Sequence, residues 1–430
     1  MKRDDSRGLS RRFALTAAMW LIAAAILQAA SLPKARPSEV GLSAERLERL
    51  TQVMQEYIDG GRIAGMVTLV ARNGRVAYLR PFGKLDLNGA AMPVNGIFRI
   101  ASQTKAVTSV AVMILQEEGK LLLDDPVSRY IPEFANVRVA VPSTDKNTKG
   151  YTTVPAKRPI TIRDLLTHTA GISYGDGLAK DKYLAAGIHG WSLADKAVPI
   201  GEIVKKLATL PFDAQPGEKW VYGYNTDILG YLVERVSGMT LAEFFAKKIT
   251  GPLGMADTHF FLPEDKLGRF TSVYGVDEKG GLKLMEDARD NSYVKGPRIC
   301  YGGGAGLLST AEDYARFLLM LQDGGELGGV RVLSPNSVEL MTVDHVGNLY
   351  DPQGFGLGFW VTERLGRNGQ PGSVDSFGWG GAYHTTYWVD PAEKLVAVLM
   401  TQLMPAGNSD LHAKFRAMVY QSIVDSYERR

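Results

Sequence analysis

The sequence predicts an α+β fold, in which both ends of the chain build an antiparallel sheet flanked by helices and a mostly helical lobe is inserted between them. Strand-like runs lie near the beginning and near the end of the 430 residues, whereas the middle shows the apolar period of helices. The composition, 45% hydrophobic and 22% charged, is typical of a globular protein. We expect one two-lobed domain over 33–430, with an α/β lobe (about 33–100 and 300–430) and a helical lobe (about 101–299).

Residues 1–30 are predicted to be an export signal and not part of the fold. Basic residues precede an apolar run from Phe13 to Leu27, and small residues follow, which is the order found in signal peptides. The stretch "SRRFAL" at Ser10 is similar to a twin-arginine signal, so we expect a periplasmic or secreted protein. The alternative is an uncleaved leader, through which alone we would expect membrane association.

Charge and cysteine content narrow the class of protein. Without the leader the chain has 44 basic and 44 acidic residues, and no basic patch indicates nucleic acid as a partner. Cys300 is the single cysteine, so no disulfide can form within the chain, and we interpret it as a buried or incidental thiol. The six histidines match no metal motif, so we predict neither a metal nor another cofactor. The oligomeric state is left open.

The elements at the two chain ends follow from local signals. Ser43 can cap a helix whose apolar face is Leu47, Leu50, Val53, Met54 and Tyr57. The stretch 65–83 reads as a hairpin that turns at Asn73-Gly74. Near the other end we expect a strand over 355–362, a hairpin over 384–402 that turns at Pro391, and a last helix over 411–424.

The middle of the chain is predicted to hold helices separated by long polar loops. Helical patterns follow Asp164, Gly201, Asn225, Thr240 and Thr310, and the stretch 136–157 reads as a surface loop. A cleft between two lobes is a common place for a small-molecule site.

Ser102 and Lys105 lie three residues apart at the start of a very apolar helix that Gly119 ends. This spacing places both side chains on one helix face. Burial and the positive end of the helix dipole both favour an uncharged lysine, so we predict a lowered pKa for Lys105. A neutral Lys105 could take the proton from Ser102, whose backbone N–H could bind an oxyanion. The alternative is an N-cap serine followed by a lysine that reaches the surface.

Two later stretches supply what this chemistry still needs. Tyr222, which precedes the helix at Asn225, offers a second proton-transfer group. Gly380 and Gly381 let a strand edge approach a ligand closely, and Ala382 then offers a second backbone N–H.

With these motifs the chain resembles the serine beta-lactamase-related hydrolases, which include class C beta-lactamases, D-alanyl-D-alanine carboxypeptidases and family VIII carboxylesterases. The matching motifs occur in the family's order, as Ser102-Gln103-Thr104-Lys105, Tyr222-Gly223-Tyr224 and Trp379-Gly380-Gly381. Further similarity lies in the stretches 160–172, 251–260 and 302–317. The resemblance runs from about Pro37 to the end and implies a beta-lactamase/transpeptidase-like fold.

Two departures from the family pattern bear on the substrate. Tyr224 stands where beta-lactamases have asparagine, and Asn225 comes one residue later. Trp379 stands in place of the lysine of a Lys-Thr-Gly motif, so an apolar wall replaces a grip on a carboxylate. Both departures resemble family VIII esterases most. Tyr224 and His384 are further candidates for contact with the substrate.

The resemblance implies a serine hydrolase that acts through an acyl-enzyme. Ser102 would attack, Lys105 and Tyr222 would share the proton transfers, and the N–H groups of Ser102 and Ala382 would hold the oxyanion. A carboxylesterase on small or medium-chain esters is the first hypothesis. The alternatives are a peptidase or amidase on D-amino-acid derivatives, a beta-lactamase, and a non-catalytic penicillin-binding-like sensor.

A rival motif and one histidine complete the candidates. "GISYG" matches the G-x-S-x-G of α/β-hydrolases, but neither a strand before Ser173 nor a helix directly after it is predicted, so we do not expect Ser173 to be the nucleophile. His168 is interpreted as a structural hydrogen-bonding residue.

Overall fold

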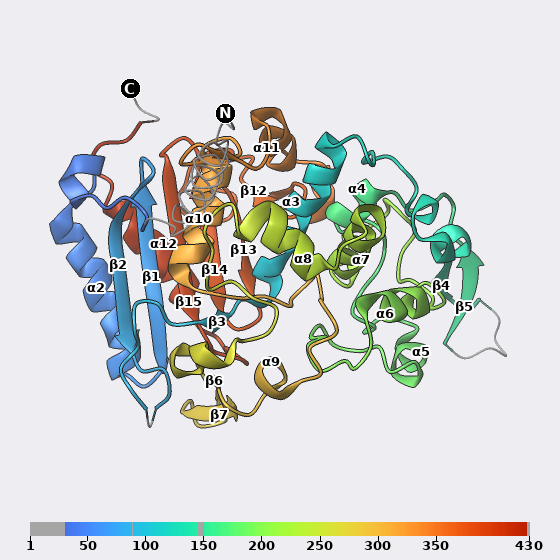
Figure 1. The fold of residues 1–430 in the computed structure, drawn as a ribbon, viewed down its shortest axis with the longest axis horizontal. Coiled ribbons are helices and arrows are strands. Elements are labelled where there is room, and N and C mark those ends of the chain that lie inside the picture. The colour runs from blue at the N-terminus through green and yellow to red at the C-terminus, as the bar shows by residue number, and fades with distance from the viewer. Residues whose placement is uncertain (1–30, 88, 145–149, 428–430) are drawn as a thin grey trace, which may run out of the picture.

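The computed structural model describes residues 31–87, 89–144 and 150–427, so the predicted export signal lies outside the described residues. Its centre is a seven-stranded antiparallel sheet in the order β11-β12-β13-β14-β15-β1-β2 (Figure 1). The strands come from both ends of the chain: β1 (Gly65–Arg72), β2 (Arg75–Gly83), β11 (Gly354–Phe355), β12 (Trp360–Val361), β13 (Phe377–Gly381), β14 (Thr385–Asp390) and β15 (Leu395–Thr401). The predicted α+β class is confirmed.

The two ends of the chain meet in the middle of this sheet. β1 pairs with β15 from Met66 opposite Thr401 to Arg72 opposite Leu395. The β1–β2 hairpin turns at Asn73-Gly74, where both residues have positive φ (54° and 68°), as the hairpin signal predicts. β13 therefore lies near the middle of the sheet, where it is paired on both sides, by β12 and β14.

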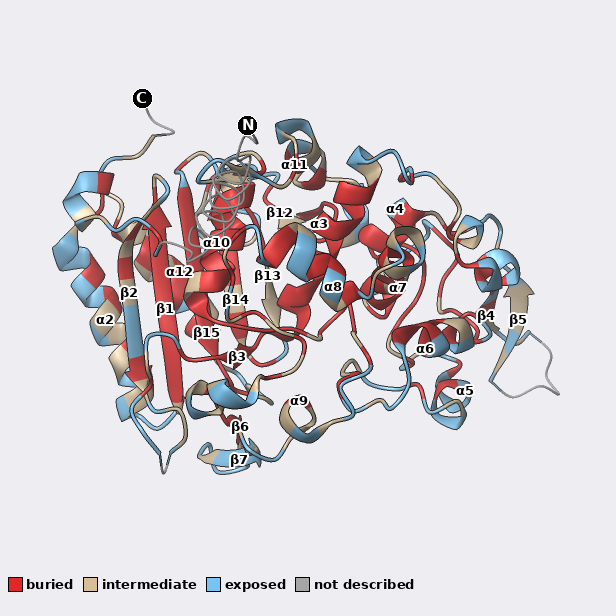
Figure 2. Cartoon of the chain, viewed as in Figure 1, coloured by how far each residue is buried: buried red, intermediate tan, exposed pale blue. Residues whose placement is uncertain are grey.

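Helices cover both faces of the sheet, because side chains alternate across a strand and both sets are apolar (Figure 2). Val67 and Leu69 of β1 belong to one core, and Met66 and Val70 belong to the other. The second core contains the apolar faces of α2 (Ala44–Asp59), which Ser43 caps as predicted, and of α12 (Leu411–Gln421). The first contains that of α10 (Ala311–Gln322).

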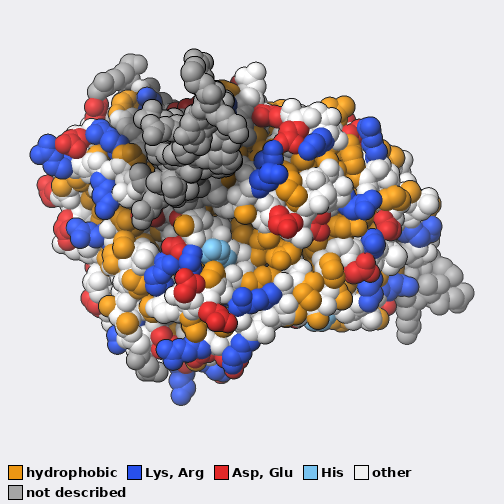
Figure 3. Space-filling model, viewed as in Figure 1, with side chains coloured by type: hydrophobic (Ala, Val, Ile, Leu, Met, Phe, Trp, Pro, Cys, Tyr) orange, Lys and Arg blue, Asp and Glu red, His pale blue; other side chains and the backbone are white. Residues whose placement is uncertain are grey.

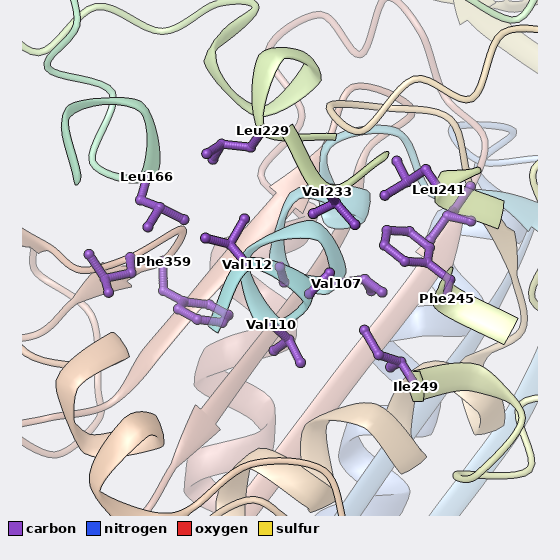
Figure 4. Close-up of a cluster of buried hydrophobic side chains, with 14 of the residues drawn as sticks. Val107, Val110, Val112, Leu166, Leu229, Val233, Leu241, Phe245, Ile249 and Phe359 are labelled. Carbon is purple, nitrogen blue, oxygen red and sulfur yellow. The ribbon is translucent and has the colours of Figure 1, made fainter. Parts of the chain in front are cut away.

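A group of helices lies beside the sheet and packs around α3 (Thr104–Glu117). Every residue of α3 from Thr104 to Leu115 is buried, and Figure 4 shows its valines among side chains of α7 and α8. The remaining helices are short, apart from α7: α4 (Ile162–Leu166), α5 (Lys180–Ala185), α6 (Ile200–Leu207), α7 (Asn225–Ser237), α8 (Leu241–Phe245), α9 (Ser292–Lys295) and α11 (Pro335–Met341). Because α3 is buried on all sides, it anchors this region against the sheet.

Two predicted elements differ from the structure. The run 355–362 is not one strand but the hairpin β11–β12, because Gly358 takes a positive φ of 102° within it. The predicted loop 136–157 contains the hairpin β4 (Arg138–Pro142) and β5 (Tyr151–Pro155), which pair with each other outside the main sheet. The strands are five residues each and β5 has no buried residue, so neither shows a regular alternation of apolar and polar side chains.

Three further short strand pairs lie outside the main sheet. They are β3 (Phe98–Arg99) with β8 (Leu308–Ser309), β6 (Val273–Val276) with β7 (Leu282–Glu286), and β9 (Glu326–Leu327) with β10 (Val330–Arg331). One of them, β6–β7, falls within the predicted helical lobe. The β3–β8 pair joins stretches on either side of the inserted segment and sets the entry to α3. The lobe boundaries stay a prediction.

On the face shown in Figure 3 basic and acidic side chains are interspersed, with hydrophobic side chains between them. Within the described ranges, no helix combines the length and the apolar character that crossing a membrane requires.

Candidate active site

Ser102 lies in a tight turn, Ala101–Gln103, between β3 and α3. Ala101 has a positive φ of 42°, an uncommon conformation for a residue with a side chain. The turn is held from α10, because the hydroxyl of Tyr314 donates a hydrogen bond to the Gln103 carbonyl at 2.8 Å. These contacts fix Ser102 at the first turn of a rigid, buried helix.

Ser102 opens onto a cavity of about 420 Å³ between the end of β13 and the loops that lead into α7. Its lining consists of Ser102, Tyr174, Trp191, Tyr222, Trp360, Trp379, Gly380, Gly381, Ala382, Thr386 and His412. The structure thus brings three sequence-distant motifs to one place. Among the residues that the structure describes, neither Asp, Glu, Lys nor Arg belongs to this lining.

Lys105 lies directly behind Ser102, on the protein side of the cavity, and only 2% of it is exposed. Its Nζ donates hydrogen bonds to the Ser102 Oγ at 3.2 Å, the Tyr174 Oη at 3.0 Å and the Gly304 carbonyl at 2.8 Å. Three acceptors match the three hydrogens of an ammonium group.

The predicted neutral Lys105 is wrong. Burial lowers the pKa of Lys105, as expected, but Tyr174, Tyr222 and the carboxylate of Asp227 raise it more, so that it lies above its ordinary value. The sequence argument counted burial and the helix dipole and could not see this acid, which comes from α7. A raised pKa favours the ammonium form of Lys105, and an ammonium cannot take the proton of Ser102.

Tyr222 lines the same cavity as Ser102. The indole N–H of Trp379 donates a hydrogen bond to its hydroxyl at 3.2 Å, and the Nζ of Lys105 lies 4.7 Å from its ring centroid. An N–H donor and the Lys105 side chain therefore both face Tyr222. Tyr222 stacks on Trp220 at 5.6 Å between centroids and contacts the His168 ring at 4.8 Å, so its ring is held on several sides.

Tyr174 is a site residue that the sequence reasoning missed, although it lies within "GISYG". It lines the cavity and contacts Lys105, and burial raises its pKa. Its neighbour Ser173 is buried, and the Ser173 hydroxyl accepts the N–H of Gly175 at 3.1 Å. No strand precedes and no helix directly follows this motif, which lacks the context of a nucleophile elbow.

Two predicted substrate contacts lie outside the cavity lining. Tyr224 is fully buried behind Tyr174, with 5.0 Å between their ring centroids, and its hydroxyl donates to the Gly190 carbonyl, so we correct its role to packing. His384 is stacked on His412 at 3.9 Å, and His412 is the one that lines the cavity. The Nε2 of His384 instead pairs with the Ser409 hydroxyl at 3.0 Å.

Asn225 and His168 form a structural pair behind Tyr222. The Asn225 side chain reaches the Nδ1 of His168 and the Ile172 carbonyl, both at 3.0 Å. Burial holds the pKa of His168 well below its ordinary value, so the ring is neutral. The asparagine that beta-lactamases place in the site is therefore turned into the core in this chain, which fits the structural role predicted for His168.

The sequence matches the family described as Beta-lactamase over residues 50–421. The chain belongs to this family. Protein Rv1367c of Mycobacterium tuberculosis (strain ATCC 25618 / H37Rv) is 36% identical over 371 residues, which cover 82% of this chain and 89% of that protein. Esterase EstB of Burkholderia gladioli is 30% identical and covers 87% of this chain and 95% of its own length.

A solved structure of a hydrolase has a similar fold. The structure of EstCE1, described as a hydrolase with promiscuous acyltransferase activity, superposes with a TM-score of 0.74 at 27% identity. The match covers 87% of this chain and 98% of that one. Its family and its relatives thus show that the chain is a serine hydrolase, and it shares the fold of these relatives.

Gly381 gives this family member a site that tolerates no side chain. A Cβ at Gly381 would lie 2.4 Å from the Ile100 carbonyl oxygen and 2.4 Å from the Thr385 Oγ1, so Gly381→Ala must push β13 away from the Ser102 turn. Because oxyanion donors work only at hydrogen-bond distance, we expect kcat for ester hydrolysis to fall about 10²–10³-fold. Gly380→Ala is the control, since its Cβ meets only the Thr385 carbonyl at 3.0 Å. Equal losses in the two variants would contradict this reading.

Proposed function

We propose that the chain is a carboxylesterase that hydrolyses small or medium-chain neutral esters through an acyl-enzyme on Ser102. The observation that carries this proposal is the uncharged lining of the cavity around Ser102. Trp379, which directly precedes Gly380 in β13, belongs to this lining. A wall of tryptophan and tyrosine favours apolar acyl and alcohol groups. The likeness to EstB and EstCE1 supports the same chemistry.

Acylation begins when the Ser102 Oγ attacks the ester carbonyl and its proton passes to the phenolate of Tyr222. The ammonium of Lys105 stabilises that phenolate before the transfer, and its hydrogen bond orients the Ser102 Oγ. The N–H groups of Ser102 and Ala382, both at the cavity, hold the tetrahedral oxyanion. Collapse expels the alkoxide, which takes the proton from Tyr222.

Deacylation uses the same groups in the reverse order. A water molecule gives one proton to Tyr222 and attacks the acyl carbon, and the oxyanion returns to the same two N–H groups. When the acid leaves, the Ser102 Oγ takes the proton back from Tyr222. Lys105 remains charged throughout, so the cycle needs one proton acceptor and not two.

An assay panel separates this proposal from its alternatives. We expect p-nitrophenyl acetate and butyrate to be turned over about 10²-fold faster than nitrocefin or a D-alanyl peptide, because a substrate carboxylate finds no cation in the lining. The measurement is kcat/KM for each compound at one pH.

Each other outcome has a distinct meaning. Equal turnover of nitrocefin would favour a beta-lactamase, and preference for the D-alanyl peptide would favour a peptidase. Labelling of Ser102 by a fluorescent penicillin without turnover of any compound would favour a sensor. We also propose export of the mature enzyme, which the sequence of residues 1–30 supports.

A further inference from the structure

Asp227, on the first turn of α7, is a buried acid that the mechanism above leaves unused. Only 2% of it is exposed. Its Oδ1 accepts the N–H of Gly304 at 2.9 Å, and the carbonyl of the same Gly304 accepts the Nζ of Lys105 at 2.8 Å. One residue of backbone therefore connects the carboxylate of Asp227 with the ammonium of Lys105.

The glycine run that makes this connection is shaped for close approach. A Cβ at Gly304 would lie 2.5 Å from the Oδ2 of Asp227, and one at Gly303 would lie 2.6 Å from the Thr226 carbonyl oxygen. On the α3 side, the Thr108 hydroxyl donates to the Gly303 carbonyl at 2.7 Å. The run thus passes between α3 and α7 with no room for a side chain, and it holds Asp227 and Lys105 on opposite sides of one peptide segment.

Lys105 is the cation whose charge acts on the buried carboxylate of Asp227. The Oδ2 of Asp227 is buried and has no hydrogen-bond partner among the described residues. A buried carboxylate is costly unless a cation compensates it. Burial raises the pKa of Asp227 to about 6 against the attraction of Lys105, so the acid is ionised at neutral pH. The other titratable groups whose pKa it influences are Tyr174, Tyr224 and Cys300, all raised in pKa and hence uncharged.

We propose that Asp227 is a positioning residue that fixes Lys105 through the Gly304 peptide and, as its counter-ion, keeps it an ammonium. The amine is then unavailable as a base, and the phenol of Tyr222 becomes the group that takes the proton from Ser102. This inference rests on the proposed function, because it takes Ser102 as the nucleophile. It explains why Tyr222, and not Lys105, would take the proton from Ser102.

The first test is the pH profile of Asp227→Asn. Asparagine keeps an oxygen for the Gly304 N–H and removes the charge. The active enzyme has lost one proton from the pair of Lys105 and Tyr222, and a nearby anion opposes that loss. Without it, the pH of half-maximal kcat/KM on the rising limb should move down by about one to three units. Well below pH 6, where Asp227 of the wild type is itself protonated, the wild type and Asp227→Asn should have the same kcat/KM.

Asp313→Asn is the matched control. Asp313 is also a buried acid with a pKa raised to about 6, but it lies on α10, where it accepts the Asp257 N–H at 2.7 Å. We expect its removal to leave the pH profile unchanged. An unmoved profile in Asp227→Asn, or an equal shift in both variants, would overturn the proposal.

The second test needs no catalysis. Thermal midpoints at pH 8 are compared for Asp227→Asn, Lys105→Met and the double variant. If the two groups are counter-ions, each single change leaves an uncompensated buried charge, and the double variant should melt higher than the sum of the two losses predicts. Folding of the double variant when Asp227→Asn fails to fold would support the proposal equally. Additive losses, or failure of both, would refute it.

The outcomes separate this inference from the proposed function. Loss of ester hydrolysis in Ser102→Ala together with additive thermal losses would leave the esterase standing and remove the role of Asp227. Coupled thermal losses together with a fully active Ser102→Ala variant would support the pairing of Asp227 with Lys105 and refute Ser102 as the nucleophile.

Discussion

Replacing Ser102 with alanine is expected to lower kcat for p-nitrophenyl butyrate by about 10⁴-fold or more, because the variant lacks the hydroxyl that Lys105 orients in the proposed mechanism. The fold should survive. Lys105 loses one of its three acceptors in this variant and keeps Tyr174 and Gly304, so the buried ammonium stays hydrogen-bonded. The thermal midpoint should therefore stay within a few degrees of the wild type.

Ser173→Ala is the matched control, since Ser173 belongs to the competing G-x-S-x-G motif and is also buried. Its hydroxyl accepts the Gly175 N–H and also hydrogen-bonds the Asp213 side chain, and neither partner lines the cavity, so kcat should change little. A phosphonate probe that labels serine nucleophiles should modify the wild type and Ser173→Ala but not Ser102→Ala. Labelling lost in Ser173→Ala and kept in Ser102→Ala would reverse the assignment of the nucleophile.

The parts of the fold that sequence reasoning predicted are those with local causes. Ser43 caps α2, and Asn73-Gly74 turns β1 into β2, because in both places the conformation follows from a few neighbouring side chains. The hairpins β11–β12 and β4–β5 were missed for the opposite reason. Their strands are too short or too exposed for an apolar period, and their pairing depends on contacts that form only in the folded chain.

The site residues likewise differ in whether a local sequence motif predicts them. Ser102, Tyr222 and the strand from Trp379 belong to motifs with recognisable spacing, and the structure places all three at one cavity. Tyr174 and His412 carry no such signal, because Tyr174 reaches Lys105 across 69 residues of sequence and His412 comes from the last helix. The direction of the Lys105 pKa shift was mispredicted because the groups that raise this pKa, Tyr174, Tyr222 and Asp227, come from separate parts of the chain. Burial can be inferred from composition, but a partner's position cannot.

Tyr222→Phe is expected to lower kcat by about 10²–10⁴-fold while KM changes little, since the variant removes the proton acceptor and leaves the aromatic wall in place. The phenyl ring can keep its contacts with Trp220 and His168, so folding should be unaffected. Stopped-flow measurement of the p-nitrophenol burst would show slower acylation.

Tyr174→Phe tests whether the other phenol at Lys105 could do the same work. Its hydroxyl contacts Lys105 at 3.0 Å but receives no indole donor like the one that Trp379 gives to Tyr222. Burial also raises the pKa of Tyr174, which disfavours its phenolate. We therefore expect a loss of only about 10-fold, from a less firmly held ammonium. A larger loss in Tyr174→Phe than in Tyr222→Phe would make Tyr174 the base and leave Tyr222 as part of the wall, because only one of the two phenols needs to exchange a proton with Ser102.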